Sequence, residues 1–161
     1  TLLENVFLIN TLPPWFSNFG KSLIKSPKLF FYDTGLAAHL MDVSFEQLQT
    51  SSSPLYGYLL ENFIVSEFTK QVCQLEQFSL YHYRSETQKE VDLIVKGFSG
   101  KLVAIEIKSS SLVVAGDFAG IKSFKSLAGN DFHLGIVLYN GKSIVSFGKD
   151  MLAVPITAMI G

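Results

Sequence analysis

Cysteine is almost absent from this 161-residue sequence, which contains Cys73 and no other. A single cysteine excludes a disulfide framework and a cysteine-rich zinc site. It fits a reducing compartment, so we expect a cytoplasmic protein. The sequence also lacks a signal-peptide pattern and any apolar run near the roughly 18 residues that a membrane-spanning helix needs. We therefore expect no membrane partner.

An excess of charge of either sign is missing as well. Lys and Arg number 13 against 14 Asp and Glu, which gives a formal net charge of −1 at pH 7. Domains that wrap a nucleic-acid duplex usually carry a clear basic excess. A nucleic-acid partner would therefore be contacted locally, weakly, or together with another part of a larger protein.

Apolar residues make up 48% of the sequence and charged residues only 17%, as in a packed globular chain. A surface so poor in charge favours a partner that covers part of it, including a second copy in a homo-oligomer. The length suits one domain with a small appendage. The sequence starts at Thr1 instead of Met, and residues 2–10 resemble the interior of a longer protein, so we expect a missing upstream part.

Two short apolar runs, at residues 6–9 and 29–32, flank the Pro13-Pro14 pair and predict an N-terminal ribbon. Asp33 then offers a cap for a short helix over residues 36–41. We assign residues 1–55 to an extension, ribbon and short helix, packed on a core formed by residues 56–161.

The core begins with the longest predicted helix, residues 56–75, whose apolar residues recur every three or four positions. Further expected elements are strands at 80–84, 91–95 and 102–109, a helix at 117–128, a strand at 133–139 and, after the turn signal Asn140-Gly141, a hairpin partner at 143–147. This order predicts an α/β (α+β) core with a mixed sheet between helices.

Asp92 and Glu106 are the first candidate site residues. If the turn at residues 96–102 closes symmetrically, residue 95 faces 103 and Asp92 faces Glu106. Opposed residues of an antiparallel pair point to the same face, roughly 5 Å apart. The repulsion between two such carboxylates disappears when a cation binds, and their oxygens suit Mg²⁺ or Mn²⁺.

Three neighbours extend this site. Lys108 lies two residues after Glu106 and therefore on the same strand face, and the backbone carbonyl of Ile107 can reach a metal. Glu61 lies near the middle of the apolar stripe of the long helix, where a carboxylate is costly unless it is paired or bound to metal. We predict that Glu61, Asp92 and Glu106 bind the metal while Lys108 orients a water or stabilises developing charge.

Each of these residues has a simpler explanation when taken alone. A Glu-x-Lys pair often lies on a solvated strand face, Asp92 can cap a turn, and Glu61 can pair with an arginine. It is the combination, in this order and on these faces, that favours a site.

The order Glu61, Val91-Asp92 and Ile105-Glu106-Ile107-Lys108 resembles the PD-(D/E)XK nuclease superfamily, whose restriction-endonuclease-like core is αβββαβ. The segments Lys25–Leu36 and Leu60–Phe63, Tyr83-Arg84 with Glu90–Asp92, and Ala153–Pro155 resemble an uncharacterised domain family found C-terminal to AAA-type ATPases. The resemblance covers nearly the whole chain. It departs at Gln88-Lys89, where the family often has a glycine.

The resemblance implies an upstream ATPase domain of the same chain, with ATP bound only there, because no Gly-rich phosphate loop occurs in this sequence. Arg84, Lys122 and Lys125 are candidate phosphate contacts, against the alternatives of a structural salt bridge and a solvated helix face. Two functions remain open: a Mg²⁺-dependent nuclease acting on nucleic acid, and a non-catalytic interaction or regulatory module of the ATPase.

Overall fold

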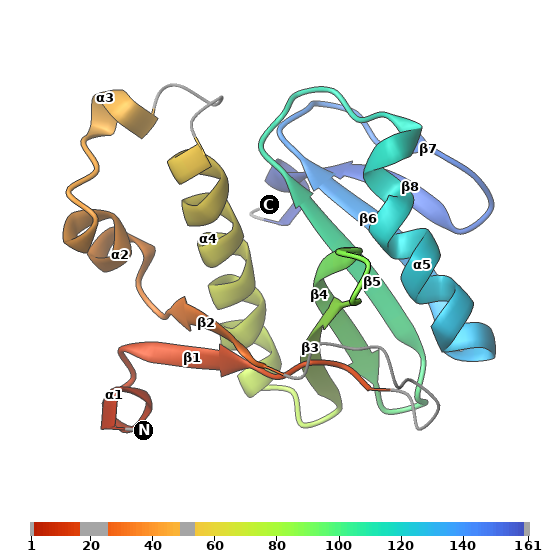
Figure 1. The fold of residues 1–161 in the computed structure, drawn as a ribbon, viewed down its shortest axis with the longest axis horizontal. Coiled ribbons are helices and arrows are strands. Elements are labelled where there is room, and N and C mark those ends of the chain that lie inside the picture. Colours follow the sequence, from red (N-terminus) through yellow and green to blue (C-terminus); the bar gives the residue numbers. More distant parts are fainter. Residues whose placement is uncertain (1, 17–25, 49–53, 160–161) are drawn as a thin grey trace.

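The computed structural model describes residues 2–16, 26–48 and 54–159 (Figure 1). The helices are α1 (Leu2–Asn5), α2 (Thr34–Leu40), α3 (Phe45–Leu48), α4 (Pro54–Cys73) and α5 (Ala119–Ala128). The strands are β1 (Ile9–Leu12), β2 (Lys28–Phe31), β3 (Phe78–Arg84), β4 (Glu90–Gly97), β5 (Leu102–Lys108), β6 (Phe132–Tyr139), β7 (Val145–Ser146) and β8 (Met151–Pro155). Short 3₁₀ helices cover residues 115–118, 129–131 and 156–159.

A mixed six-stranded sheet in the order β3-β4-β5-β6-β8-β7 forms the centre of the molecule. Strands β3, β4 and β5 are antiparallel, whereas β5, β6 and β8 run parallel. From α4 to β6 the elements follow the order αβββαβ, with α4 and α5 on opposite faces of the sheet (Figure 1). The predicted α/β (α+β) fold class, with a central mixed sheet between helices, is confirmed.

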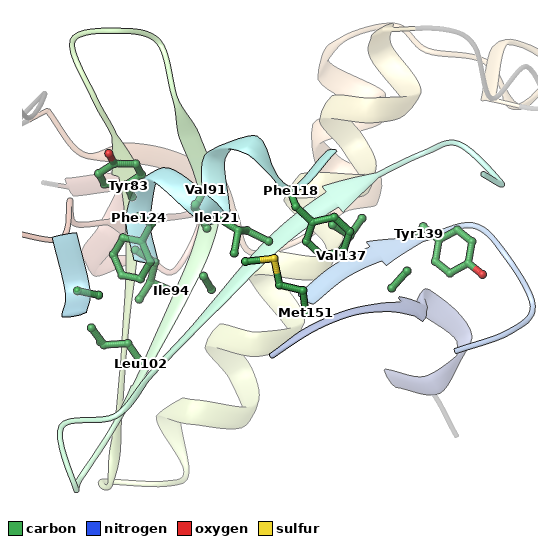
Figure 2. Packing of buried hydrophobic residues seen from close by; sticks show 13 residues of the cluster. Tyr83, Val91, Ile94, Leu102, Phe118, Ile121, Phe124, Val137, Tyr139 and Met151 are labelled. Atoms are coloured by element: carbon green, nitrogen blue, oxygen red, sulfur yellow. The ribbon is translucent and has the colours of Figure 1, made fainter. Parts of the chain in front are cut away.

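Each face of the sheet has its own hydrophobic core. Ile121 and Phe124 of α5, both fully buried, pack with Phe118 on Val91 and Val137 (Figure 2). On the other face, Ile64 and Val65 of α4 pack on apolar residues of β4, β5 and β6 and on the N-terminal ribbon, namely Leu93, Ile105, Leu138, Leu12 and Phe30. Strands that are covered on both faces need nearly continuous apolar sequence, and β6 has it.

The N-terminal ribbon predicted from the sequence is the antiparallel pair of β1 and β2. Its first strand starts at Ile9 because Phe7 has a positive φ of 56° and turns the chain there. The ribbon continues onto the edge of β3, where the Trp15 N–H donates to the His82 carbonyl at 2.7 Å. The Trp15 ring meets Phe124 edge-on, with 4.9 Å between ring centroids. Trp15 thereby anchors the extension to the core.

Two helix predictions are confirmed near the site. Asp33 caps α2, since its Oδ1 accepts a hydrogen bond from the Leu36 N–H at 2.7 Å. The long predicted helix is α4, which begins at Pro54, a residue favoured in the first turn because its missing N–H has no partner to lose. The helix ends at Cys73, so Leu75 lies outside it and is exposed.

The predicted hairpin after Asn140-Gly141 is wrong. Strand β6 lies between β5 and β8, and the short β7 pairs only with β8. The reason is burial: β8 brings Met151, Ala153 and Pro155 into the interior, whereas Val145 and Ser146 of β7 are exposed. The segment with more apolar surface to bury takes the place beside β6. Among the described helices, none has the length and apolar character needed to cross a bilayer.

The close approach of α5 to β4 predicts opposite effects for two glycine substitutions. A Cβ at Gly120 would lie 1.8 Å from the Glu90 carbonyl oxygen, whereas a Cβ at Gly57 of α4 would meet no atom within 4 Å. Urea unfolding should show that Gly120→Ala lowers the free energy of unfolding by about 3 kcal/mol. Gly57→Ala should raise it by roughly 0.5–1 kcal/mol. Equal effects of the two substitutions would contradict this packing.

Candidate functional site

A β-bulge positions Asp92. Between the pairs Tyr81–Ile94 and Tyr83–Val91, β3 advances by two residues and β4 by three, so β4 holds one extra residue. Val91 and Ile94 both face α5, while Leu93 belongs to the core beneath α4. Strict alternation would place Val91 and Ile94 on opposite faces, so the bulge reorients the backbone at Asp92. Bulges commonly redirect a side chain beside a functional site.

The predicted register between β4 and β5 is confirmed, because Val95 pairs with Val103 and Leu93 with Ile105. The ladder ends there, one pair before Asp92 and Glu106. Past its end, Asp92 Oδ2 accepts a hydrogen bond from the Ile107 N–H at 3.0 Å. The Asp92 side chain thus replaces the missing ladder bond and is fixed against β5. The predicted role of the Ile107 carbonyl as a metal ligand stays a prediction.

Lys28 of β2 belongs to the site, although it was not among the residues predicted from the sequence. Its Nζ lies 2.8 Å from Glu61 Oε1 and 3.3 Å from Asp92 Oδ1, so one ammonium bridges α4 and β4. The three side chains are 23%, 22% and 14% exposed, respectively. A sequence signal existed: Lys28 shares a strand face with Phe30, which is buried against α4. A cation on a core-facing side requires acidic partners.

Glu106 and Lys108 form the second ion pair. Lys108 Nζ donates to Glu106 Oε1 at 2.9 Å, as expected for residues two apart on one strand face. The other oxygen, Glu106 Oε2, is buried and has no hydrogen-bond partner. A buried carboxylate oxygen without a partner is costly, so this atom points to a missing ligand or proton.

The carboxylates influence one another strongly. Burial, followed by the charge of Asp92, raises the pKa of Glu106 to about 7. Burial and Asp92 also raise the pKa of Glu61, against the opposing effect of Lys28. Burial lowers the pKa of Lys28, but Asp92 and Glu61 together outweigh it, so the net shift is upward. All three shifts place Asp92 at the electrostatic centre of the site.

The donor atoms suit a hard divalent cation, but their arrangement includes Lys28. Carboxylate oxygens are the ligands that Mg²⁺ prefers, and Glu106 Oε2 is unused. Within residues 2–16, 26–48 and 54–159, however, no group of three or more His, Cys, Asp or Glu side chains is arranged to hold a metal ion. Lys28 takes up one oxygen of Glu61 and one of Asp92. The donor set thus has the chemistry of a divalent-cation site, whereas Lys28 occupies two of its oxygens.

Comparison with known proteins identifies the family. Residues 56–159 match the family described as Domain of unknown function (DUF4143), and residues 1–47 match Domain of unknown function (DUF8612). The chain belongs to the DUF4143 family. The expected membership of an uncharacterised domain family is thereby confirmed, whereas the PD-(D/E)XK resemblance and the upstream ATPase stay predictions.

Curated relatives of this DUF4143 domain include the uncharacterized proteins Rv2008c of Mycobacterium tuberculosis and Mb2031c of Mycobacterium bovis. Each is 32% identical over 109 residues, which cover 68% of this chain and 24% of the relative. The chain thus spans about a quarter of their length. One similar solved structure is an assembly of Thermococcus gammatolerans McrB AAA+ hexamers with bound McrC. The match covers 62% of this chain and 27% of the chain in that assembly, with 10% sequence identity and a TM-score of 0.41. A likeness this low places no constraint on function.

A cavity of about 480 Å³ adjoins the site of the DUF4143 domain. The N-terminal β2 and α2 form one side, and α4 with the start of β4 forms the other. Its lining includes Lys28 and Glu61 of the ion cluster, Arg84, and the apolar residues Leu29 and Tyr58. The cavity therefore connects the ion cluster with solvent.

The candidate phosphate contacts are divided between two places. Arg84 lines the cavity, where its Nε lies 2.8 Å from Glu90 Oε1 and its Nη2 donates to Gln88 Oε1 at 2.9 Å. Lys125 Nζ pairs with Asp150 Oδ2 at 2.5 Å, and Lys122 is exposed on α5, which covers the other face of the sheet. Arg84 is thus the candidate nearest the ion cluster, and phosphate contact by all three residues stays a prediction.

The raised pKa of Glu106 predicts an unusual pH dependence of stability. Its folded-state pKa of about 7 lies above the ordinary value of 4.5, so between these values the folded protein binds more protons than the unfolded chain. The free energy of unfolding should therefore fall as pH rises from about 4.5 to 7. In urea unfolding, the parent should lose roughly 3 kcal/mol of its free energy of unfolding over this pH range. Glu106→Gln should show no such loss, because glutamine does not titrate. Glu76→Gln, at an exposed position, is the control, and parallel curves for parent and Glu106→Gln would refute the assignment.

Proposed function

We propose that this DUF4143 domain is a Mg²⁺-dependent phosphodiesterase that acts on nucleic acid. The observation that supports it most is Glu106, whose buried Oε2 lacks a partner and whose neighbours are Asp92 and Lys108. An apolar or neutral pair would cost less at this place in a structural protein. A bound divalent cation would supply the partner that Glu106 Oε2 lacks.

Asp92 and Glu106 would hold the metal, and Glu61 would join them from α4. When bound, Mg²⁺ supplies a more acidic water and stabilises charge on a phosphoryl oxygen. Asp92 is kept in place by the Ile107 N–H and the bulge of β4, so its carboxylate needs little reorganisation. Fixed ligands of this kind are what a precise site requires.

Lys108 would supply a positive charge that stabilises the transition state. Its ammonium lies on the same strand face as Glu106 and is 34% exposed, so it can reach solvent and a substrate. Burial lowers the pKa of Lys108, but the charge and hydrogen bond of Glu106 together with the charge of Asp92 outweigh burial and raise it, so Lys108 remains protonated at neutral pH. A protonated lysine beside the metal ligands can donate to a phosphoryl oxygen or orient the attacking water.

A second candidate function is a metal-free, non-catalytic module C-terminal to a AAA-type ATPase, which binds nucleic acid or protein or regulates the ATPase. The observation that favours it is Lys28, which neutralises Glu61 and Asp92 without a metal. The net charge of −1 agrees, since a free-standing nuclease usually has a more basic face. The upstream ATPase itself is proposed from the family resemblance alone.

Metal binding and cleavage separate the two functions. Calorimetric titration of Mg²⁺ or Mn²⁺ into the 161-residue chain should give heat that Asp92→Asn and Glu106→Gln abolish. Single- and double-stranded DNA and RNA should then be tested for metal-dependent cleavage. Lys108→Met should slow cleavage about 100-fold or more because it removes a transition-state contact. It should not weaken metal binding, since Lys108 is no ligand and its ammonium repels the metal.

Lys149→Gln serves as the control, because Lys149 is an exposed lysine in the turn before β8. Cleavage that persists in Glu106→Gln would come from a contaminating nuclease or another site and would refute the assignment. Absence of metal binding by the parent at millimolar concentration would favour the metal-free interaction module. Metal binding without cleavage of any of the four substrates would refute the phosphodiesterase and leave only the metal site.

A further inference from the structure

The position of Lys28 conflicts with a metal at the same carboxylates. Its Nζ lies within 3.3 Å of both Glu61 Oε1 and Asp92 Oδ1. A divalent ion that ligates these oxygens at its usual distance of about 2.1 Å would lie only a few ångströms from the ammonium. Two cations that close repel strongly in a partly buried place. Lys28 and the metal therefore exclude each other.

No other described cation replaces Lys28 at Glu61. Besides Asp92, the groups whose charges act on Glu61 are Lys28 and Glu90, and Glu90 forms its ion pair with Arg84. Lys108 is held by Glu106. Departure of Lys28 would thus leave Glu61 without a cation, while Asp92 would keep only the more distant charge of Lys108 and the Ile107 N–H. Two carboxylates with so little compensating charge attract a divalent cation.

The Lys28 side chain can leave without moving the ribbon. Strand β2 is fixed to α4 separately by the buried Asn62, whose Oδ1 accepts from the Phe31 N–H at 2.8 Å and whose Nδ2 donates to the Phe31 carbonyl at 3.0 Å. The 480 Å³ cavity lies directly beside Lys28 and offers space for a long, flexible lysine side chain. Rotation of this side chain alone can therefore withdraw the ammonium from Glu61 and Asp92.

From this geometry we propose that Lys28 is an internal counter-cation that occupies the metal site until a divalent ion displaces it into the neighbouring cavity. The inference rests on the proposed function. Under it, the metal-free cluster is a stable resting state of the domain, and metal affinity is set by competition with Lys28. The N-terminal extension, which carries Lys28, thereby regulates a site whose carboxylates all belong to the core.

Metal titrations of Lys28 variants test the competition. Lys28→Gln and Lys28→Met should bind Mn²⁺ at least about tenfold more tightly than the parent, because the competing charge is gone. Lys28→Arg should stay close to the parent, and Lys149→Gln is the matched control for loss of an exposed lysine. In thermal unfolding, metal-free Lys28→Gln should melt below the parent, and Mn²⁺ should raise its melting temperature by more than it raises that of the parent.

A measurement on the parent protein requires no variant to fold. Lysine acylation followed by mass spectrometry should show Lys28 reacting several-fold faster at saturating Mn²⁺ than without metal, while Lys149 is unchanged. Equal Mn²⁺ affinity of the parent and Lys28→Gln, or unchanged labelling of Lys28 at saturation, would overturn the counter-cation and leave the metal site standing. If neither the parent nor Lys28→Gln binds Mn²⁺ at millimolar concentration, the proposed function fails and this inference fails with it.

Discussion

The need to neutralise the Asp92 carboxylate governs the arrangement around it. Asp92 lies at a bulge where the β4–β5 ladder ends, and it completes that ladder by accepting the Ile107 N–H. Its charge draws in Lys28 from the ribbon and contributes to the raised pKa values of Glu61 and Glu106. Elements far apart in the sequence therefore meet at one carboxylate, and each depends on the balance of charge there.

The fold provides this place through its two separate cores. Packing of α5 on one face and of α4 with the ribbon on the other fixes β4 and β5 from both sides (Figures 1 and 2). Lys28 and Glu61, which meet Asp92 near the end of the ladder, line the cavity beside β2. A polar cluster is tolerated there because the apolar burial elsewhere stabilises the domain. Function and stability thus occupy neighbouring parts of the same sheet.

The periodicity of apolar residues and the residues typical of turns made most of this fold predictable. The symmetric turn after β4 predicted the register of Val95 with Val103, and the spacing of Glu106 and Lys108 predicted their shared face. The bulge at Asp92 was not predictable because it arises from pairing with β3. Lys28 is 64 residues from Asp92, and no local pattern reports such a contact. The local signal of Asn140-Gly141 misled because the burial of β8 outweighed a favourable turn.

We propose that the carboxylates around Asp92 form a divalent-metal site, and that Lys28 is the cation bound there when no metal is present. Anomalous diffraction from crystals of this chain grown with millimolar Mn²⁺ tests it most directly. We expect an anomalous peak within coordination distance of the Asp92 and Glu106 carboxylates, with Lys28 Nζ withdrawn from Asp92. Absence of a peak, with Lys28 still between Glu61 and Asp92, would contradict it.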